Sequence, residues 1–292
     1  MADLAIFTDR RTVRSADELT ALIRFRKAAF DGGHKLDLLF YTELSYLSNY
    51  QGILIRTLTD PLNTAYVVAK WAEIYGIRVL DTPDSIRICC DKVNMYGRLM
   101  KARVPIPQTA FLGKEDLVPA RAEALFDAWG FPLILKAPNS SFSAYVEKVA
   151  TPHEFVSIGR RFFRRADRIV VQGFVKSSFD WRVITLGQDV LAVVKYVFAP
   201  DRWKTEQRSE SGEWATVVAV AVEEADQGLL ELARAAAAAM GNSLYGIDIK
   251  EVEGGYLVIE VNDNPTIAAG QEDRANPDIY ERIVAYLASE VG

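Results

Sequence analysis

Short apolar runs alternate with amphipathic stretches along residues 1–85. Period-two or continuous apolar runs predict strands, and apolar residues three and four positions apart predict helices. Strands that alternate with helices favour a mostly parallel sheet, on which ligands bind beyond the carboxyl ends of the strands. Arg56 ends one such run, so it is either a candidate anion ligand or a solvated strand end. The expected strands are Leu4–Thr8, Leu36–Phe40, Gly52–Arg56 and Arg78–Leu80, and the expected helices are Asp17–Phe30 and Leu62–Tyr75.

The pattern changes after residue 85, where period-two stretches on either side of glycine turns indicate antiparallel hairpins. We therefore expect a chain of mixed α/β and α+β class with three units, residues 1–85, 86–168 and 169–292. The further strands expected are Pro132–Lys136, Val146–Val149 and Ile169–Val175, and the further helices are Asp84–Lys101, Arg121–Trp129, His153–Arg165 and Glu223–Met240.

The last hairpin, Leu244–Asn262, reads LYGIDIKEVEGGYLVIEVN and turns at Glu253–Gly255. Counted outward from that turn, Asp248 and Glu260 become cross-strand neighbours about 5 Å apart, with Asn262 on the same face. Two facing acids destabilise a hairpin unless a cation lies between them. Such oxygen ligands suit Mg²⁺ or Mn²⁺, whereas a hairpin offset by one residue leaves both acids in water. The residues expected on the opposite face are Leu257, Ile259 and Val261.

An earlier hairpin, residues 181–198, carries the opposite charge and turns near Gly187. With a turn at Gln188, Arg182 faces the position next to Lys195, which predicts two neighbouring cations and an anion between them. Lys136, at the end of an apolar strand, and Lys92, on a helix, are further cations. Each lysine alone is more often a surface residue, but cations combined with an acidic metal cluster favour phosphoryl transfer from a nucleotide.

Composition narrows the function classes. The net charge of −5 and the pI near 5.3 argue against nucleic-acid binding, which requires a basic surface. No apolar run reaches the ~20 residues of a membrane span, and the N-terminus lacks the pattern of a signal peptide. The two cysteines are adjacent, which favours a reduced, cytoplasmic protein. With only two histidines, a His/Cys zinc site is not expected.

Taken in order, these motifs resemble those of ATP-grasp enzymes of the RimK-like carboxylate–amine ligase group. The resemblance implies a small N-terminal α/β domain, followed by two α+β subdomains that hold ATP between antiparallel sheets. The matching segments are DKVNMYGRLMKARVPIPQT, LILKAPNSSFSAYVEKV, VVQGFV, FDWRV, LYGIDIK and VIEVNDNPTI.

The resemblance also implies roles for individual residues. Those expected to contact ATP are Lys92 and Lys136 at the phosphates, Ser141 and Phe142 in the phosphate loop, the backbone of Gln172, Gly173 and Val175 at the adenine, and Asp180 at the ribose. Arg182 is expected to stabilise the transferred phosphoryl group, and Lys195 is added as a catalytic candidate because the hairpin pairing above places it beside Arg182. The expected ligands of two Mg²⁺ ions, replaceable by Mn²⁺, are Asp248, Glu260 and Asn262.

Two positions depart from the pattern of many relatives. The loop Asn139–Ser143 over the phosphates contains no glycine, although backbone and hydroxyl donors can still bind phosphate. The strand before the hairpin of residues 181–198 has Gly173 where many relatives carry an acid, which leaves the ribose contacts open.

The implied reaction has two steps, formation of an acyl phosphate from a carboxylate and ATP, then attack by an amine to give an amide. By analogy, the acceptor side is lined by Trp203–Arg208 and Thr266–Arg274, whose charges suit an amino acid or a peptide end. The acceptor is therefore expected to be an amino acid, a peptide or a carrier protein, and the chain could form a homo-oligomer. The candidate substrate residues are Arg56, Lys204, Asn264 and Arg274.

Two other classes stay open. A kinase on the same fold would phosphorylate a hydroxyl group and form no amide. A non-catalytic nucleotide-binding module would keep its lysines but have no need of metal ligands. The presence of Asp248, Glu260 and Asn262 together favours an enzyme.

Overall fold

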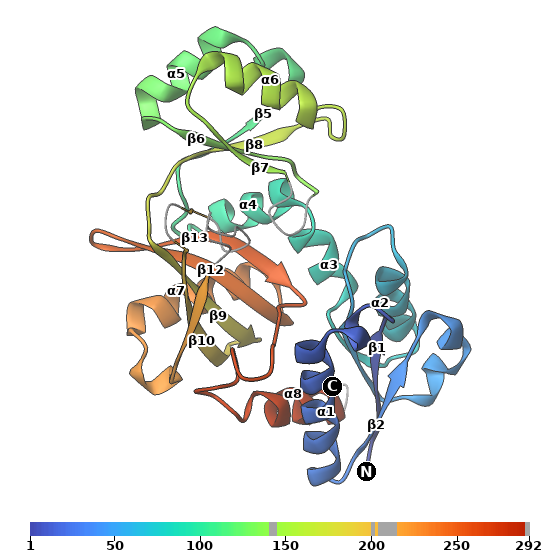
Figure 1. Ribbon diagram of the computed structural model, residues 1–292. Coiled ribbons are helices and arrows are strands. Elements are labelled where there is room, and N and C mark those ends of the chain that lie inside the picture. Colours follow the sequence, from blue (N-terminus) through green and yellow to red (C-terminus); the bar gives the residue numbers. More distant parts are fainter. Residues whose placement is uncertain (140–144, 200–201, 204–214, 290–292) are drawn as a thin grey trace.

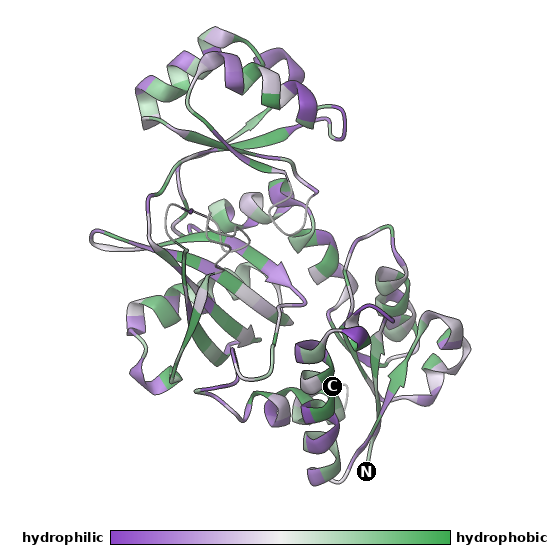
Figure 2. Ribbon diagram, in the orientation of Figure 1, coloured by the Kyte–Doolittle hydropathy of each residue, from purple (hydrophilic) through white to green (hydrophobic). Residues whose placement is uncertain are grey.

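The computed structural model describes residues 1–139, 145–199, 202–203 and 215–289. These residues build three sheets, each covered by helices (Figure 1). In Figure 2 the strands of the first sheet are mainly hydrophobic, whereas α1 and α6 alternate hydrophilic and hydrophobic residues, as expected of helices with one buried side. No helix within the described residues is long and apolar enough to cross a membrane.

The first sheet is parallel, with strand order β2-β1-β3-β4. It confirms the expected α/β unit at the N-terminus, but its core also takes in the C-terminal helix α8 (Ile279–Ala288), which the sequence pattern did not reveal. This helix lies beside α1 (Figure 1). The elements are β1 (Asp3–Thr8), α1 (Ala16–Asp31), β2 (Lys35–Leu39), β3 (Gly52–Arg56), α2 (Thr64–Ile74) and β4 (Arg78–Leu80), with 3₁₀ turns at Thr12–Arg14 and Tyr41–Asn49.

The second sheet is antiparallel, with strand order β5-β8-β6-β7, and packs against α5 and α6. Its strand β8 (Ile169–Gly173) pairs with strands on both sides. The expected domain boundary at residue 168 is therefore wrong, because it would separate β8 from the sheet whose centre it forms. The other elements are β5 (Thr109–Leu112), α5 (Pro119–Trp129), β6 (Leu133–Lys136), β7 (Val146–Val149) and α6 (Pro152–Phe162), with a 3₁₀ turn at Lys114–Asp116.

The third sheet is antiparallel, with strand order β11-β10-β9-β12-β13. Its apolar side chains pack against α4 (Lys92–Lys101) and α7 (Gln227–Met240) in one core. Because side chains alternate along a strand, the other face carries the charged residues Asp180, Arg182, Asp248, Lys250 and Glu260. The strands are β9 (Phe179–Leu186), β10 (Asp189–Val197), β11 (Thr216–Val220), β12 (Leu244–Val252) and β13 (Gly255–Asp263), and a 3₁₀ turn at Val222–Glu224 precedes α7.

The helix expected at Asp84–Lys101 is in fact two, α3 (Pro83–Cys89) and α4. The break occurs because the Asp91 carboxylate accepts hydrogen bonds from the backbone N–H groups of Val93 and Asn94, as an N-cap residue does. This cap starts α4 at Lys92 and so places that lysine at the end of the helix that meets the third sheet.

Candidate active site

A pocket of about 520 Å³ is lined by residues from all three sheets. At one end lie Lys136 and Gln172 of the second sheet, and at the other lie Asp9 and Arg56, which follow or end parallel strands of the first sheet. The polar face of the third sheet connects the two ends. The pocket thus joins the region expected to hold a nucleotide with the region expected to hold substrates.

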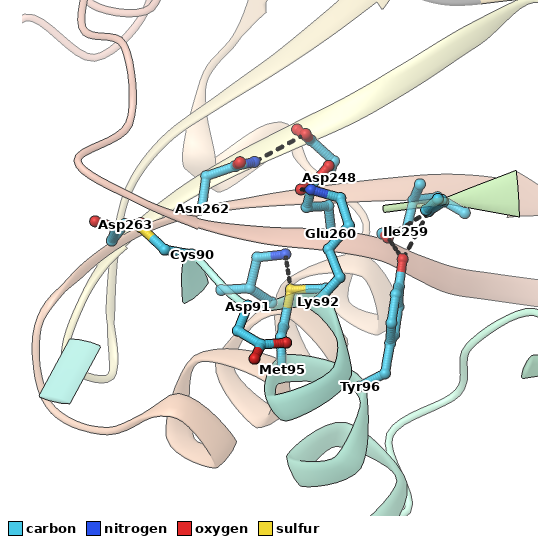
Figure 3. Close-up of polar contacts among 12 residues, drawn as sticks. Cys90, Asp91, Lys92, Met95, Tyr96, Asp248, Ile259, Glu260, Asn262 and Asp263 are labelled. Carbon is cyan, nitrogen blue, oxygen red and sulfur yellow. Dashed lines mark hydrogen bonds and ion pairs between the residues drawn. The ribbon is translucent and has the colours of Figure 1, made fainter. Parts of the chain in front are cut away.

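The register of the last hairpin brings the expected metal ligands together. Asp248 pairs with Glu260, as predicted, and Asn262 Nδ2 donates to Asp248 Oδ2 at 3.1 Å (Figure 3). The ladder contains a bulge at this point, because Ile249 pairs with Val258 and leaves Ile259 as an extra residue.

This bulge corrects the expected orientation of the apolar residues of β13. Val258, rather than Leu257, joins Val261 in the core, and Ile259 lines the pocket. The reason is that an extra residue reverses the alternation of side chains from the bulge toward the turn.

Both carboxylates expected to bind metal already have a cationic partner in the protein. Asp248 accepts two hydrogen bonds from Arg182, from Nε at 2.7 Å and from Nη2 at 2.9 Å. Glu260 Oε1 lies 2.7 Å from Lys92 Nζ, which reaches it from α4 (Figure 3). Burial acts to raise the pKa of Glu260, but Lys92 and Lys136 outweigh it and lower that pKa. The expected repulsion between the two acids is therefore offset by protein cations.

The predicted pair of cations in the earlier hairpin is wrong. Arg182 faces Val194, whereas Lys195 faces Trp181 and so lies on the opposite side of the sheet. Lys195 Nζ lies 3.5 Å from the centre of the Phe179 ring, and the residue does not line the pocket. Val194, which faces Arg182, is next to Lys195 on the same strand. Because adjacent side chains on a strand point to opposite faces, Lys195 lies on the face away from Arg182. A catalytic role for Lys195 has no support from this placement.

Lys136 lies at the nucleotide end of the pocket and is almost fully buried. Its Nζ donates to the Tyr96 hydroxyl at 2.7 Å, and this hydroxyl also contacts Gln172 Oε1 at 3.2 Å and the carbonyl of Ile259 (Figure 3). Burial lowers the pKa of Lys136 to about 8, and nearby Lys92 adds to this effect while Glu260 opposes it. An anion that enters the pocket would stabilise the charged form of this lysine.

The backbone expected to read the adenine is only partly available. The N–H of Gly173 donates to the carbonyl of Gln108 at 3.0 Å, and Gln172 is paired in the sheet on both sides. These neighbours on both sides of β8 come from other parts of the chain, so sequence reasoning on one segment does not reveal them. Val175, beyond the strand end, lines the pocket and keeps its predicted role as a proposal.

Asp180 lines the pocket and forms an ion pair with Lys250. Burial raises the pKa of Asp180 to about 6, although Lys250 opposes this shift. Lys250 is a pocket residue that the sequence analysis missed. Its position two residues after Asp248 on one strand was the available signal, because such residues share a face.

At the other end of the pocket, two predicted substrate residues meet. Arg56 Nη1 donates to Asn264 Oδ1 at 3.1 Å and to the carbonyl of Pro265 at 2.6 Å, while Nη2 donates to Glu18 at 3.1 Å. The Arg56 side chain is 5% exposed, so it is not the solvated strand end considered above. These bonds hold the segment after β13 against the first sheet.

Two acids near this segment, the buried Asp81 and the half-buried Asp263, were also missed. The carboxylate of Asp81 accepts hydrogen bonds from the Ser243 hydroxyl and from the backbone N–H of Asn264. Burial raises the pKa of Asp263 to about 6, and the carboxyl contacts the Cys90 thiol at 3.8 Å. Their isolated positions after a short strand and at a strand end carry no pattern that predicts such an arrangement.

Of the four predicted residues that remain, the structure describes one. Arg274 is exposed and does not line this pocket. Ser141, Phe142 and Lys204 lie outside the described residues.

The donor set of the hairpin fits a hard divalent cation. Within the described residues, no three His, Cys, Asp or Glu side chains group closely enough to hold a metal alone. The candidate ligands are instead the carboxylates of Asp248 and Glu260 and the amide oxygen of Asn262. Mg²⁺ is commonly bound by one or two carboxylates, with waters and substrate phosphates as further ligands. Two carboxylates beside a pocket that Lys136 and Lys250 also line meet this requirement.

The second and third sheets both line the pocket, the second with Lys136 and the third with the paired acids, and this arrangement agrees with the ATP-grasp fold. The RimK-like ATP-grasp domain family model matches residues 89–287, about two thirds of the chain. The chain belongs to this family, and the expected ATP-grasp ligase class is confirmed.

Similar proteins agree with this assignment. A glutamate–LysW ligase, ArgX, of Sulfolobus acidocaldarius is 24% identical, with 82% of this chain and 83% of the relative covered. A probable α-L-glutamate ligase of Pseudoalteromonas atlantica is 24% identical, with 91% and 90% covered. The crystal structure of a RimK domain ATP-grasp protein from Sphaerobacter thermophilus has a TM-score of 0.70 at 18% identity over 99% of this chain and all of that one. D-alanine–D-alanine ligase from Bacillus anthracis, complexed with ATP, has a TM-score of 0.73 at 14% identity, with 99% and 96% covered.

Proposed function

We propose that this protein joins the carboxylate of an amino acid to an amine in an ATP-dependent reaction that passes through an acyl phosphate. The observation that carries the proposal is the continuous pocket, in which a nucleotide end and a substrate end meet at Arg182, Asp248 and Glu260. A non-catalytic nucleotide-binding module has no need of a substrate end joined to the nucleotide end. A kinase also needs an acceptor site beside the nucleotide, and a ligase is favoured over a kinase because the relatives are named as ligases.

In the first step an oxygen of the substrate carboxylate attacks the γ-phosphorus of ATP. The bond from that phosphorus to the bridging oxygen breaks, and ADP leaves. Lys136 and Lys92 would hold the phosphates, and Arg182 would face the group in transfer. Asp248, Glu260 and Asn262 would hold Mg²⁺, which supplies charge neutralisation to the phosphate oxygens.

In the second step an amine attacks the carbonyl carbon of the acyl phosphate. A C–N bond forms, inorganic phosphate leaves, and the nitrogen loses a proton. The chain needs no covalent nucleophile for this sequence. Burial raises the pKa of the Cys89 thiol well above its usual value and also raises that of Cys90, which makes both poor nucleophiles. The contribution of the site is therefore positioning and charge stabilisation.

The relatives guide the choice of substrates. Those named above act, by their names, on glutamate, on the protein LysW or on D-alanine. In this chain the substrate end of the pocket carries Asp9, Glu18 and Arg56, side chains that suit the charged groups of an amino acid or a peptide end. We infer an amino-acid carboxylate as the first substrate, and an amino acid, a peptide or a carrier protein as the amine.

The test is a trap for the acyl phosphate. The purified protein is incubated with ATP, Mg²⁺, hydroxylamine and each of the twenty amino acids, and both ADP and the amino-acid hydroxamate are measured. A hydroxamate formed with stoichiometric ADP supports a ligase. ADP with a phosphorylated product that does not react with hydroxylamine would identify a kinase, and tight ATP binding without ADP release would identify a binding module.

A further inference from the structure

The guanidinium group of Arg182 is held from two directions. Its Nε and Nη2 atoms donate to Asp248, as described above. Its Cζ atom lies 5.1 Å from the centre of the Tyr196 ring, which β10 supplies. A cation over an aromatic face is attracted by the ring quadrupole, more strongly where water is excluded. Because Tyr196 is itself buried, this contact fixes one side of the guanidinium plane.

The Tyr196 ring is fixed in turn by a buried carboxylate. Its hydroxyl donates to Glu272 Oε1, and Glu272 Oε2 accepts the backbone N–H of Ala268 at 2.7 Å. Glu272 is 1% exposed, and both of these donors are neutral. A buried carboxylate without a cation nearby is costly, and Arg182 on the far side of the ring is a cation that offsets its charge.

We propose that Tyr196 and Glu272 are positioning residues that fix the orientation of the Arg182 guanidinium toward the group transferred in the reaction. This inference rests on the function proposed above. Asp248 alone is a poor anchor for the arginine, because the same carboxylate is a candidate metal ligand and a cation would compete for its oxygens. The Tyr196 ring and Glu272 are independent of that competition.

Glu272 also ties Arg182 to the substrate end of the pocket. It belongs to the segment that follows Pro265 and Thr266, both of which line that end, and its bond to Ala268 shapes the segment. The bonds of Glu272 to the Tyr196 hydroxyl and to the Ala268 N–H therefore connect the ring that contacts Arg182 with the segment at the substrate end.

The test compares two tyrosines that bond to the same segment. Tyr196→Phe removes the bond to Glu272, and Tyr280→Phe removes a bond of 2.8 Å to the next residue, Asp273. Asp273 bonds to Tyr280, Arg24 and the backbone N–H of Gly270 rather than to Tyr196. Glu272→Gln is the second test variant. We measure hydroxamate formation, AMP-PNP affinity with Mg²⁺, thermal unfolding and, without turnover, the rate at which phenylglyoxal modifies Arg182, read by mass spectrometry.

We expect Tyr196→Phe and Glu272→Gln to lower kcat about tenfold, less than the ~10²-fold or more for loss of a direct donor, because they act through Arg182. AMP-PNP affinity and the ATP KM should stay within about twofold of wild type. Arg182 should react faster with phenylglyoxal in both variants but not in Tyr280→Phe, even where all three lose thermal stability.

Equal loss of kcat in Tyr196→Phe and Tyr280→Phe would mean that the bonds only stabilise the segment, and would overturn the proposal. Unchanged phenylglyoxal reactivity of Arg182 would overturn it as well. If no amino acid gives a hydroxamate, the proposed function fails, while the labelling rates still decide whether Tyr196 and Glu272 orient Arg182.

Discussion

Lys136 gives the chain a pH dependence that can be calculated from its burial. The pKa of this lysine falls from 10.5 to about 8, chiefly because burial penalises its charge. Between these two values the unfolded chain binds a proton that the folded chain lacks, so stability rises with pH across this window. The full effect is about 3 kcal/mol, of which roughly 2 kcal/mol develops between pH 7 and 9.5.

The perturbation is Lys136→Met, which keeps the length of the side chain and removes its titration. Urea unfolding of both proteins, followed by tryptophan fluorescence at pH 7 and 9.5, gives the comparison. Other groups titrate in the same range, but they do so in both proteins and cancel in the difference. Wild type should gain roughly 2 kcal/mol relative to the variant at the higher pH.

Nucleotide binding provides a second measurement of the same quantity. Loss of the lysine charge above about pH 8 should weaken ATP binding to wild type more steeply than to Lys136→Met, since phosphate favours the charged form. A difference in unfolding free energy that stays constant from pH 7 to 9.5 would refute the reasoning. It would mean that water or a rearranged neighbour solvates the ammonium group in the folded chain.

Three further substitutions test the site. Arg182→Lys keeps the charge but loses the two-pronged contact with Asp248, so kcat should fall about 10²-fold while the ATP KM changes little; a steep rise in KM with normal kcat would contradict this. Asp248→Asn should lower metal-free stability by about 1–2 kcal/mol in urea unfolding, because it leaves Arg182 without its anion, whereas Glu253→Gln in the exposed turn should not. Gly246→Ala would put a Cβ 2.7 Å from that of Pro265 and should destabilise the chain by about 1–3 kcal/mol, while Gly97→Ala, with open space around it, should be neutral or stabilising.

The pairing of Asp248 with Glu260 was predictable because a hairpin register follows from the position of its turn. The bulge at Ile259 was not, since nothing in the period-two pattern marks an extra residue. It nevertheless matters for the site. The carbonyl of Ile259 accepts a hydrogen bond from the Tyr96 hydroxyl, and this hydroxyl in turn accepts one from Lys136.

The cationic partners of Asp248 and Glu260 could not be predicted from the pattern of one hairpin, because they come from other parts of the chain. Asp248 is flanked by Glu260 on one side and by Arg182 of β9 on the other, and strand order across the sheet decides this. Lys92 arrives from a helix far away in the sequence. The hairpin alone, with two facing acids, predicts that Asp248→Asn keeps or raises the metal-free stability. The whole sheet reverses the sign, because the substitution also takes the anionic partner from Arg182.

In the proposed site, the binding of ATP and Mg²⁺ replaces ion pairs within the protein by contacts with the two ligands. The two carboxylates proposed to bind metal are paired beforehand, Glu260 with Lys92 and Asp248 with Arg182, so the site avoids the large cost of leaving these four groups as isolated buried charges. When a phosphate group binds Lys92 and a metal ion binds Glu260, both members of the ion pair gain new partners at the same time. Either ligand alone would free one charge without a replacement. The paired arrangement therefore favours joint binding of ATP and Mg²⁺ over binding of either one, and this coupling follows from the same contacts that stabilise the fold.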